Sequence, residues 1–174
     1  MTIPRTKKIH VVCAGTFDHY HPGHTSFLRQ ARNLGTHLTV IIARDATVQR
    51  LKHYIPNPER LRAQRVRQRR WVTRVVLGSL TNPFDRVASL KPDIIALGYD
   101  QHYFVERLRK EMKRRGLTPQ IVRLQPFQPH RYKSSLLTKH KKFVNVRALH
   151  LRHIHARQKS RIQRHAKKRK AKDA

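Results

Sequence analysis

The chain has 174 residues, with 40 Lys and Arg against 9 Asp and Glu and a formal net charge of +31. This length suits a single domain with a real core, and the charge excess favours polyanions generally while determining no fold. No apolar stretch is long enough to span a bilayer and no secretory signal is visible, so we expect neither a membrane-spanning segment nor a membrane partner. The single Cys13 cannot form an intramolecular disulfide, so we expect a soluble cytoplasmic protein.

Short apolar runs alternate with amphipathic segments through residues 1–138. Helical periodicity follows residue 24, where Phe27, Leu28 and Ala31 share a face and Gly35 is placed to end the helix. Further helices are predicted at 58–74, with a strongly basic face, around Phe84 to Leu90, and at 103–115, closed by Gly116. Strands are predicted at 9–14, 38–43, 75–77, 93–97 and 120–124. This alternation predicts one α/β domain, Rossmann-like, with a parallel sheet and helices on both faces.

The most informative segment is residues 15–24, GTFDHYHPGH, between the first strand and the first helix. Backbone N–H groups at a helix start have no intrahelical partner and favour phosphate. Gly15 and Gly23 allow a close approach to a ligand, and His21 and His24 can donate to charge that shifts during transfer. Asp18 can cap or hold the turn, with Thr16 and Phe17 beside it. A metal pair is the plainer alternative, but no Cys, third His or carboxylate stands nearby at a familiar ligand spacing.

Three loops fall at predicted carboxyl ends of strands, where ligands bind in parallel sheets. They are the 15–24 segment, Arg44-Asp45 after the second strand, and residues 98–101 after the fourth. This coincidence predicts one shared site.

The composition changes at about residue 139. Residues 139–174 hold fourteen Lys and Arg, five His and a single acid, Asp173. We expect a second unit there, a flexible or partly helical tail that binds nucleic acid non-specifically. A host whose proteins are generally basic would explain the same tail.

The 15–24 segment resembles the HxGH motif of the cytidylyltransferase-like nucleotidyltransferases, here His21-Pro22-Gly23-His24. Residues 43–48 with Lys52, and residues 94–101, resemble the archaeal-type FAD synthetase branch. The resemblance covers residues 8 to 137. It implies phosphate-binding roles for Lys52 and Arg60, nucleotide contacts for Gly98, Tyr99 and Asp100, and a late motif that includes Tyr132, Ser134 and Ser135.

The resemblance implies a reaction in which FMN attacks the α-phosphate of ATP and pyrophosphate leaves, with His21, His24, Lys52 and Arg60 as catalytic residues. Mg²⁺ would be held mainly by the nucleotide phosphates, with no protein metal site. One alternative is CTP transfer to glycerol 3-phosphate or a similar alcohol phosphate. Another, of a different class, is an RNA- or ribosome-associated polyanion-binding protein on the same scaffold. The sequence leaves a homodimer open.

Overall fold

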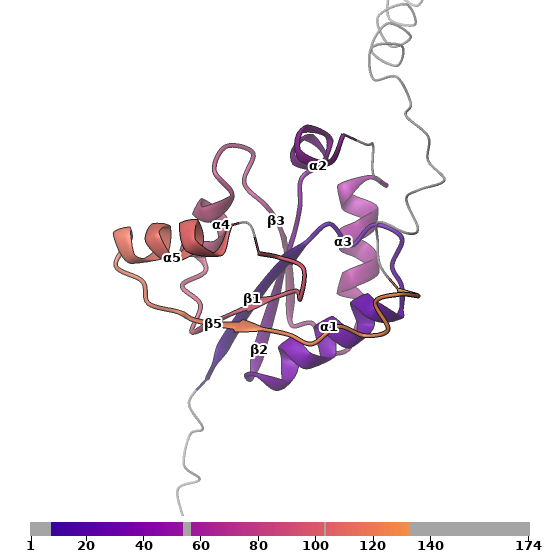
Figure 1. Cartoon of the computed structure of the whole chain (residues 1–174), viewed down its shortest axis with the longest axis horizontal. Helices are drawn as coiled ribbons and strands as arrows, with labels where there is room; N and C mark the ends of the chain where they lie inside the picture. Colours follow the sequence, from indigo (N-terminus) through magenta and orange to yellow (C-terminus); the bar gives the residue numbers. More distant parts are fainter. Residues whose placement is uncertain (1–7, 54–56, 103, 133–174) are drawn as a thin grey trace, which may run out of the picture. The chain divides into compact units, whose positions relative to one another are not determined.

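The computed structural model describes residues 8–53, 57–102 and 104–132 (Figure 1). They contain five strands and five helices, with one helix between successive strands except for the two helices between the second and third strands. The strands are β1 (His10–Gly15), β2 (His37–Ile42), β3 (Arg74–Leu77), β4 (Ile94–Leu97) and β5 (Gln120–Arg123). The helices are α1 (Pro22–Asn33), α2 (Asp45–Lys52), α3 (Glu59–Arg67), α4 (Pro83–Ser89) and α5 (Val105–Arg114).

All five strands are parallel and lie in the order β3-β2-β1-β4-β5. Cys13 of β1 pairs with Val40 of β2 on one side and with Ala96 of β4 on the other. After β1 the chain adds β2 and β3 on one side of that strand. It then crosses over to add β4 and β5 on the other side. Ligands bind at the carboxyl ends of the strands where such an order reverses. The β1–β4 junction is therefore the expected site.

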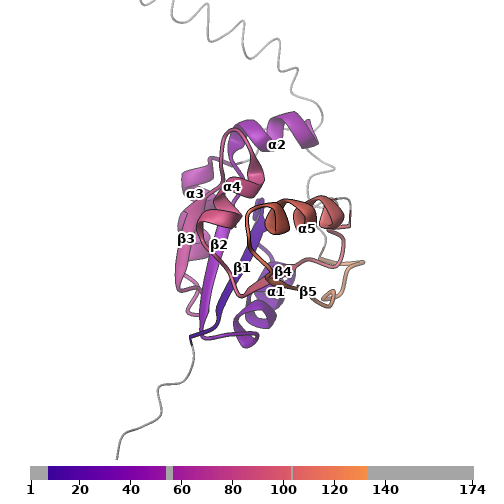
Figure 2. The same ribbon diagram turned by 90° about the vertical axis from the view of Figure 1, so that its left-hand side faces the viewer.

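Two apolar clusters sandwich the sheet, because successive residues of a strand face opposite sides. Val11 and Cys13 of β1 pack with Leu28 of α1 and Val66 of α3. Val12 faces the other way, into a cluster with Leu108 and Met112 of α5 and with Phe84 of α4. Figure 2 brings α4 and α5 toward the viewer. The predicted parallel α/β domain with helices on both faces is confirmed.

One predicted helix boundary is wrong, and one predicted helix cap does not have the expected conformation. The helix expected over 58–74 ends at Arg67, because the chain turns over the next residues and Arg74 already pairs with Thr39 in the sheet. Gly35 is not a left-handed helix cap. Its value lies in having no side chain, since a Cβ there would lie 2.7 Å from the carbonyl oxygen of Ile9. Gly116 does adopt the left-handed conformation expected of it after α5, with φ 70°.

The helix α2 has no counterpart among the predicted elements. Its eight residues bury only Val48, so the apolar periodicity is weak. None of the helices in the described residues is long and apolar enough to cross a membrane. The expected basic tail, residues 139–174, lies outside the described residues, so the division of the chain at 138/139 stays a prediction.

Candidate active site

The loop after β1 delivers two histidines to the start of α1. His21 is the residue before the helix, in an extended conformation, and its carbonyl accepts from the backbone N–H of His24 at 2.9 Å. Gly23 is required for space: a Cβ there would lie 2.9 Å from the His21 ring and 3.0 Å from the carbonyl oxygen of Tyr132. Both histidine rings thus lie at the end of the helix that favours anions.

The rings of His21 and His24 stack on each other with their centroids 3.8 Å apart. Phe17 lies against His24 from another side, at 5.1 Å. Burial lowers the pKa of His24 to about 3, helped by repulsion from His21 and Lys52, and burial also lowers the pKa of His21. Both rings are therefore neutral at pH 7. A neutral imidazole still donates one N–H, so the pair can bind phosphate oxygens. As negative charge develops on those oxygens, an imidazole of the pair can take up a proton and become positively charged.

Asp18 holds the loop from inside. Its side chain is almost fully buried, and Oδ1 accepts from the backbone N–H groups of His19 and Asn57, each at 3.2 Å, and from the Asn57 side-chain amide. The residues on either side of Asp18, Phe17 and His19, have φ of 52° and 46°. Non-glycine residues adopt that conformation only where the surroundings impose it. Asp18, expected among the nucleotide-binding residues, does not line the cavity at the β1–β4 junction; it maintains the loop that does.

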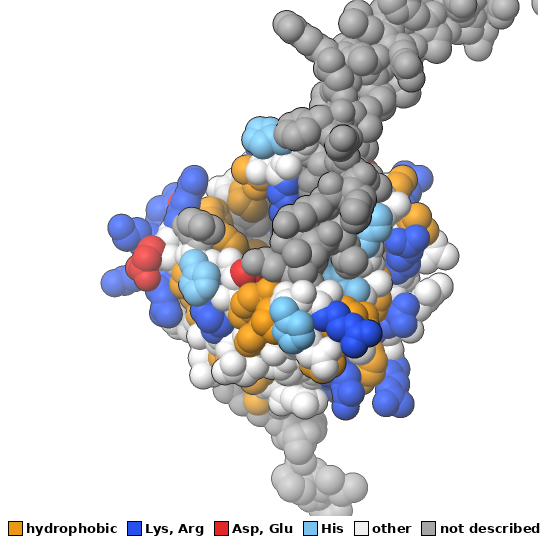
Figure 3. All heavy atoms as spheres, turned by 45° about the vertical axis from the view of Figure 1, so that its right-hand side comes forward, with side chains coloured by type: hydrophobic (Ala, Val, Ile, Leu, Met, Phe, Trp, Pro, Cys, Tyr) orange, Lys and Arg blue, Asp and Glu red, His pale blue; other side chains and the backbone are white. Residues whose placement is uncertain are grey.

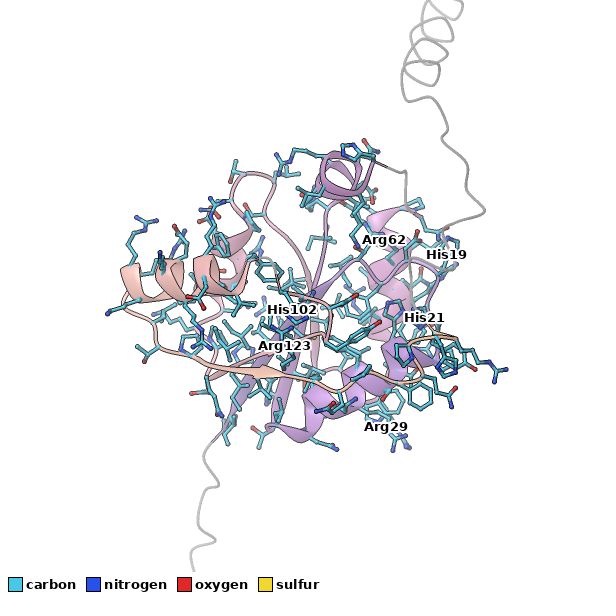
Figure 4. The ribbon with its side chains drawn as sticks, viewed as in Figure 1. His19, His21, Arg29, Arg62, His102 and Arg123 are labelled. Atoms are coloured by element: carbon cyan, nitrogen blue, oxygen red, sulfur yellow. The ribbon has the colours of Figure 1, made fainter. Side chains whose placement is uncertain are left out.

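A fully buried arginine, Arg62 of α3, fastens the same loop to the sheet (Figure 4). Its Nη1 donates to the carbonyl of Thr16, its Nη2 to the carbonyl of Ala43 at 2.7 Å, and its Nε to that of Asn57 at 2.7 Å. It also forms an ion pair with Asp45 at 2.6 Å. A guanidinium with planar, fixed donors suits this task, whereas an ammonium does not.

The sequence pointed to Arg60, not to Arg62. Two positions along a helix turn a side chain by roughly 200°, so the two arginines of α3 face opposite ways. Arg62 points into the domain, whereas Arg60 is exposed and does not line the cavity. The structure therefore does not bring Arg60 to the other predicted site residues, and its catalytic role stays a prediction without support from this placement.

The Arg44-Asp45 pair does not face the cavity either. The Asp45 carboxylate accepts from the backbone N–H of Glu59 at 3.1 Å, and the Glu59 carboxylate accepts from that of Asp45 at 2.9 Å. Each acid thus caps the other's helix, α2 and α3, and Arg44 adds an ion pair to Glu59 at 3.2 Å. This arrangement orients α2, which ends in Lys52.

A cavity of about 430 Å³ opens at the β1–β4 junction. Its volume is typical of small-molecule sites. Lys52 lies on its wall, with Nζ donating to Thr16 Oγ1 at 3.0 Å. Removal from water lowers the pKa of that amine, and nearby Asp100 opposes the effect. The predicted site residues that line the cavity are Gly15, Thr16, Phe17, His21, Gly23, His24, Lys52, Gly98, Tyr99, Asp100 and Tyr132.

Six further lining residues had no role in the sequence prediction of the site: Ala14, Phe27, Gln101, Gln125, Pro126 and Phe127. Of these, Gln101 lies in the predicted 98–101 loop, although no function was assigned to its side chain. Gln101 is the most instructive. Its side chain accepts from the N–H of Gly98 at 2.8 Å and donates to the carbonyl of Ala14 at 3.2 Å, so it joins the ends of β4 and β1. An amide directly after a strand end was the available signal. Phe127 gave none, because the proline-rich segment around it has no periodicity.

Ser134 and Ser135 lie outside the described residues, so their predicted contacts stay predictions. Within the described residues no group of three His, Cys, Asp or Glu could hold a metal ion. Among the described residues that line the cavity, Asp100 alone carries a carboxylate.

The comparisons with known proteins agree with this geometry. The sequence profile of the Cytidylyltransferase-like family matches residues 12–160. The chain belongs to the cytidylyltransferase-like family. It is a nucleotidyltransferase of the adenylyl type, in line with its curated relatives. FAD synthase of Methanosarcina mazei is 47% identical over 66% of this chain and 75% of that protein. FAD synthase of Methanoculleus marisnigri is 44% identical over 67% of this chain and 77% of that protein.

A solved structure supports the same fold. The lipopolysaccharide core biosynthesis protein of Thermoplasma volcanium superposes with a TM-score of 0.66 and 35% identity, covering 70% of this chain and 100% of that one.

Proposed function

We propose that this cytidylyltransferase-like protein is an FMN adenylyltransferase, which converts ATP and FMN to FAD and pyrophosphate. The observation that carries the proposal is the stacked His21–His24 pair at the start of α1, facing Lys52 across a single cavity. The archaeal relatives named FAD synthase support ATP and FMN as the substrates.

An oxygen of the FMN phosphate attacks the α-phosphorus of ATP. The bond from that phosphorus to the oxygen that bridges it to the β-phosphorus breaks, and pyrophosphate leaves with the electron pair. No protein nucleophile is required, since positioning and charge stabilisation suffice for such a transfer. His21 and His24 donate to the phosphoryl and pyrophosphate oxygens, together with the N–H groups of the helix start. Lys52 holds the other phosphate at the Thr16 side of the cavity.

The Mg²⁺ complex of ATP is the substrate form in this proposal. Because Asp100 is the single carboxylate among the described lining residues, the phosphates themselves supply most ligands of the ion. The ion neutralises phosphate charge when it is bound.

The test is a substrate screen with the full-length chain. ATP or CTP is combined with FMN or glycerol 3-phosphate, and pyrophosphate release and the mass of the product are recorded. We expect equal amounts of FAD and pyrophosphate from ATP and FMN. Turnover of CTP with glycerol 3-phosphate, without FAD formation from ATP and FMN, would establish the alternative substrates and refute ours.

The histidine roles are tested in the same assay. His21→Ala or His24→Ala should lower the rate by about 100- to 1000-fold, the usual effect of removing one donor to a developing charge. His102→Ala is the matched control, because His102 is exposed just beyond the 98–101 loop and does not line the cavity (Figure 4). A near-normal rate in the His24 variant would contradict the assigned role.

A further inference from the structure

A second hollow lies beside the active-site cavity, on the outer side of α1. This groove has a volume of about 610 Å³ and shares His21 and Phe127 with the active site. We call it the arginine groove. Its other lining residues are Tyr20, Pro22, Thr25, Ser26, Arg29, Gln30, Asn33 and Arg69.

Arginine and aromatic side chains alternate along this side of the domain. The guanidinium of Arg69 lies over the Tyr20 ring, 4.5 Å from its centroid. Beyond the groove lies Trp71, and the guanidiniums of Arg29 and Arg70 lie 5.8 and 5.5 Å from its ring. Arg29 projects from α1 to solvent (Figure 4), and Arg70 is exposed as well.

Among the described residues, the segments that form this side contain no acidic residue. Residues 19–44 and 60–84, which include α1 and the chain from α3 to β3, contain no Asp or Glu. In the part of the chain that the structure describes, Arg29, Arg69 and Arg70 form no ion pair. On the opposite face of the sheet, Arg115 of the α5 turn pairs with Asp85 and Glu111. Figure 3 shows Lys and Arg side chains along both margins of the domain, with an acidic side chain lying among those at the left.

These features match the chemistry of a polynucleotide strand. Guanidiniums bind phosphates through two parallel hydrogen bonds, and indole and phenol rings stack on bases of any sequence. Gln30 and Asn33 add donors and acceptors suited to base edges. An acidic peptide would use the guanidiniums but not the half-buried Trp71 ring, so the aromatic residues favour nucleic acid.

We propose that the arginine groove and Trp71 bind a single-stranded polynucleotide, with its phosphates on Arg29, Arg69 and Arg70. A base stacks on Trp71 after one of its two exposed arginines moves to a phosphate. All the residues of this site lie in the part of the chain that the structure describes. The argument for this site does not rest on the proposed adenylyl transfer, although the groove shares His21 and Phe127 with the active site.

Trp71 is the single tryptophan of the chain, so its fluorescence reports on this site alone. Full-length protein is titrated with a twenty-residue oligouridine, with a duplex and with heparin, a polyanion that has no bases. We expect the oligouridine to quench Trp71 emission, and heparin to bind with little quenching. Unchanged emission on binding oligouridine would overturn the proposal, as would equal quenching by heparin. Stronger quenching by the duplex would also overturn it, because paired bases cannot stack on the ring.

Paired charge variants separate the groove from bulk charge. Arg29→Gln/Arg70→Gln should weaken oligouridine binding at least tenfold, measured by anisotropy of a labelled oligonucleotide. It should also reduce the slope of log K against log salt by about 1.4 for two lost phosphate contacts. The control, Arg109→Gln/Lys110→Gln, removes two exposed charges of α5. An equal loss in the control would mean that bulk charge drives binding, which would refute the proposal. Thermal unfolding of each variant verifies the fold.

Discussion

The desolvated state of His24 predicts a pH dependence of stability that its replacement removes. Burial lowers the pKa of this ring to about 3 in the folded protein, against 6.5 for an exposed histidine. At pH 7 the ring is neutral in both states and contributes nothing. As the pH falls below 6.5, the unfolded chain takes up the proton while the folded protein does not. Stability is therefore lost toward acid.

The magnitude follows from the gap between the two pKa values. A solution at pH 5 is about 1.5 pH units below the pKa of the ring in the unfolded chain. At about 1.4 kcal/mol per unit, protonation of the unfolded chain lowers the free energy of unfolding by about 2 kcal/mol. His24→Asn lacks this ring. The difference in unfolding free energy between the variant and the native sequence should therefore shift by about 2 kcal/mol in favour of the variant between pH 7.5 and pH 5.

Urea unfolding of both full-length proteins at the two pH values measures this shift. Carboxylates and the other histidines titrate in both proteins, so the comparison isolates His24. An identical difference at pH 7.5 and pH 5 would show that the ring is hydrated in the folded protein. The assignment of two neutral donors to the helix start would then fail.

Three further predictions follow from the same geometry. Burial lowers the pKa of both His21 and His24, and a bound phosphate opposes that effect, so ATP binding near pH 6 should be accompanied by proton uptake. Calorimetry in buffers of different ionisation enthalpy measures this uptake, and proton release would contradict the prediction. Lys52→Met should lower kcat/KM at least 100-fold while Arg60→Met stays within about threefold, and the reverse order would restore the sequence-based role of Arg60. Gly35→Ala should destabilise the protein by about 1–3 kcal/mol in urea unfolding, because the added Cβ contacts the Ile9 carbonyl. The control is Gly116→Ala, whose Cβ meets no atom within 4 Å and adds only about 1 kcal/mol of backbone strain. Equal losses of stability in the two variants would refute the contact.

The parts of the site that are contiguous in sequence were predictable. The 15–24 segment contains the strand end, the glycines and both histidines, so its position between β1 and α1 followed from local pattern alone. The parallel sheet followed from the alternation of strands and helices, which places the 98–101 loop beside that segment.

The supports of the site were not predictable, because they depend on long-range contacts. Asp18 is a loop anchor only because Asn57, 39 residues away, donates to it. Arg62 and Arg60 are the same residue type two positions apart, and only the orientation of α3 against β2 decides which one is buried. The first backbone N–H of helix α2 is capped by Glu59 of another helix, and its Leu51 is 68% exposed. The sequence of α2 therefore shows neither a local cap nor a clear apolar face, which are the two usual signals of a helix.

The central claim is direct transfer at the His21–His24 site, without a covalent enzyme intermediate. The most direct test is the configuration of the α-phosphorus after the reaction of FMN with ATP that carries a chiral thio-substitution there. One in-line displacement inverts that centre, and we predict inversion. Retention would indicate two displacements through a nucleotidyl-enzyme intermediate. One of the two histidines would then act as a nucleophile, which contradicts direct transfer.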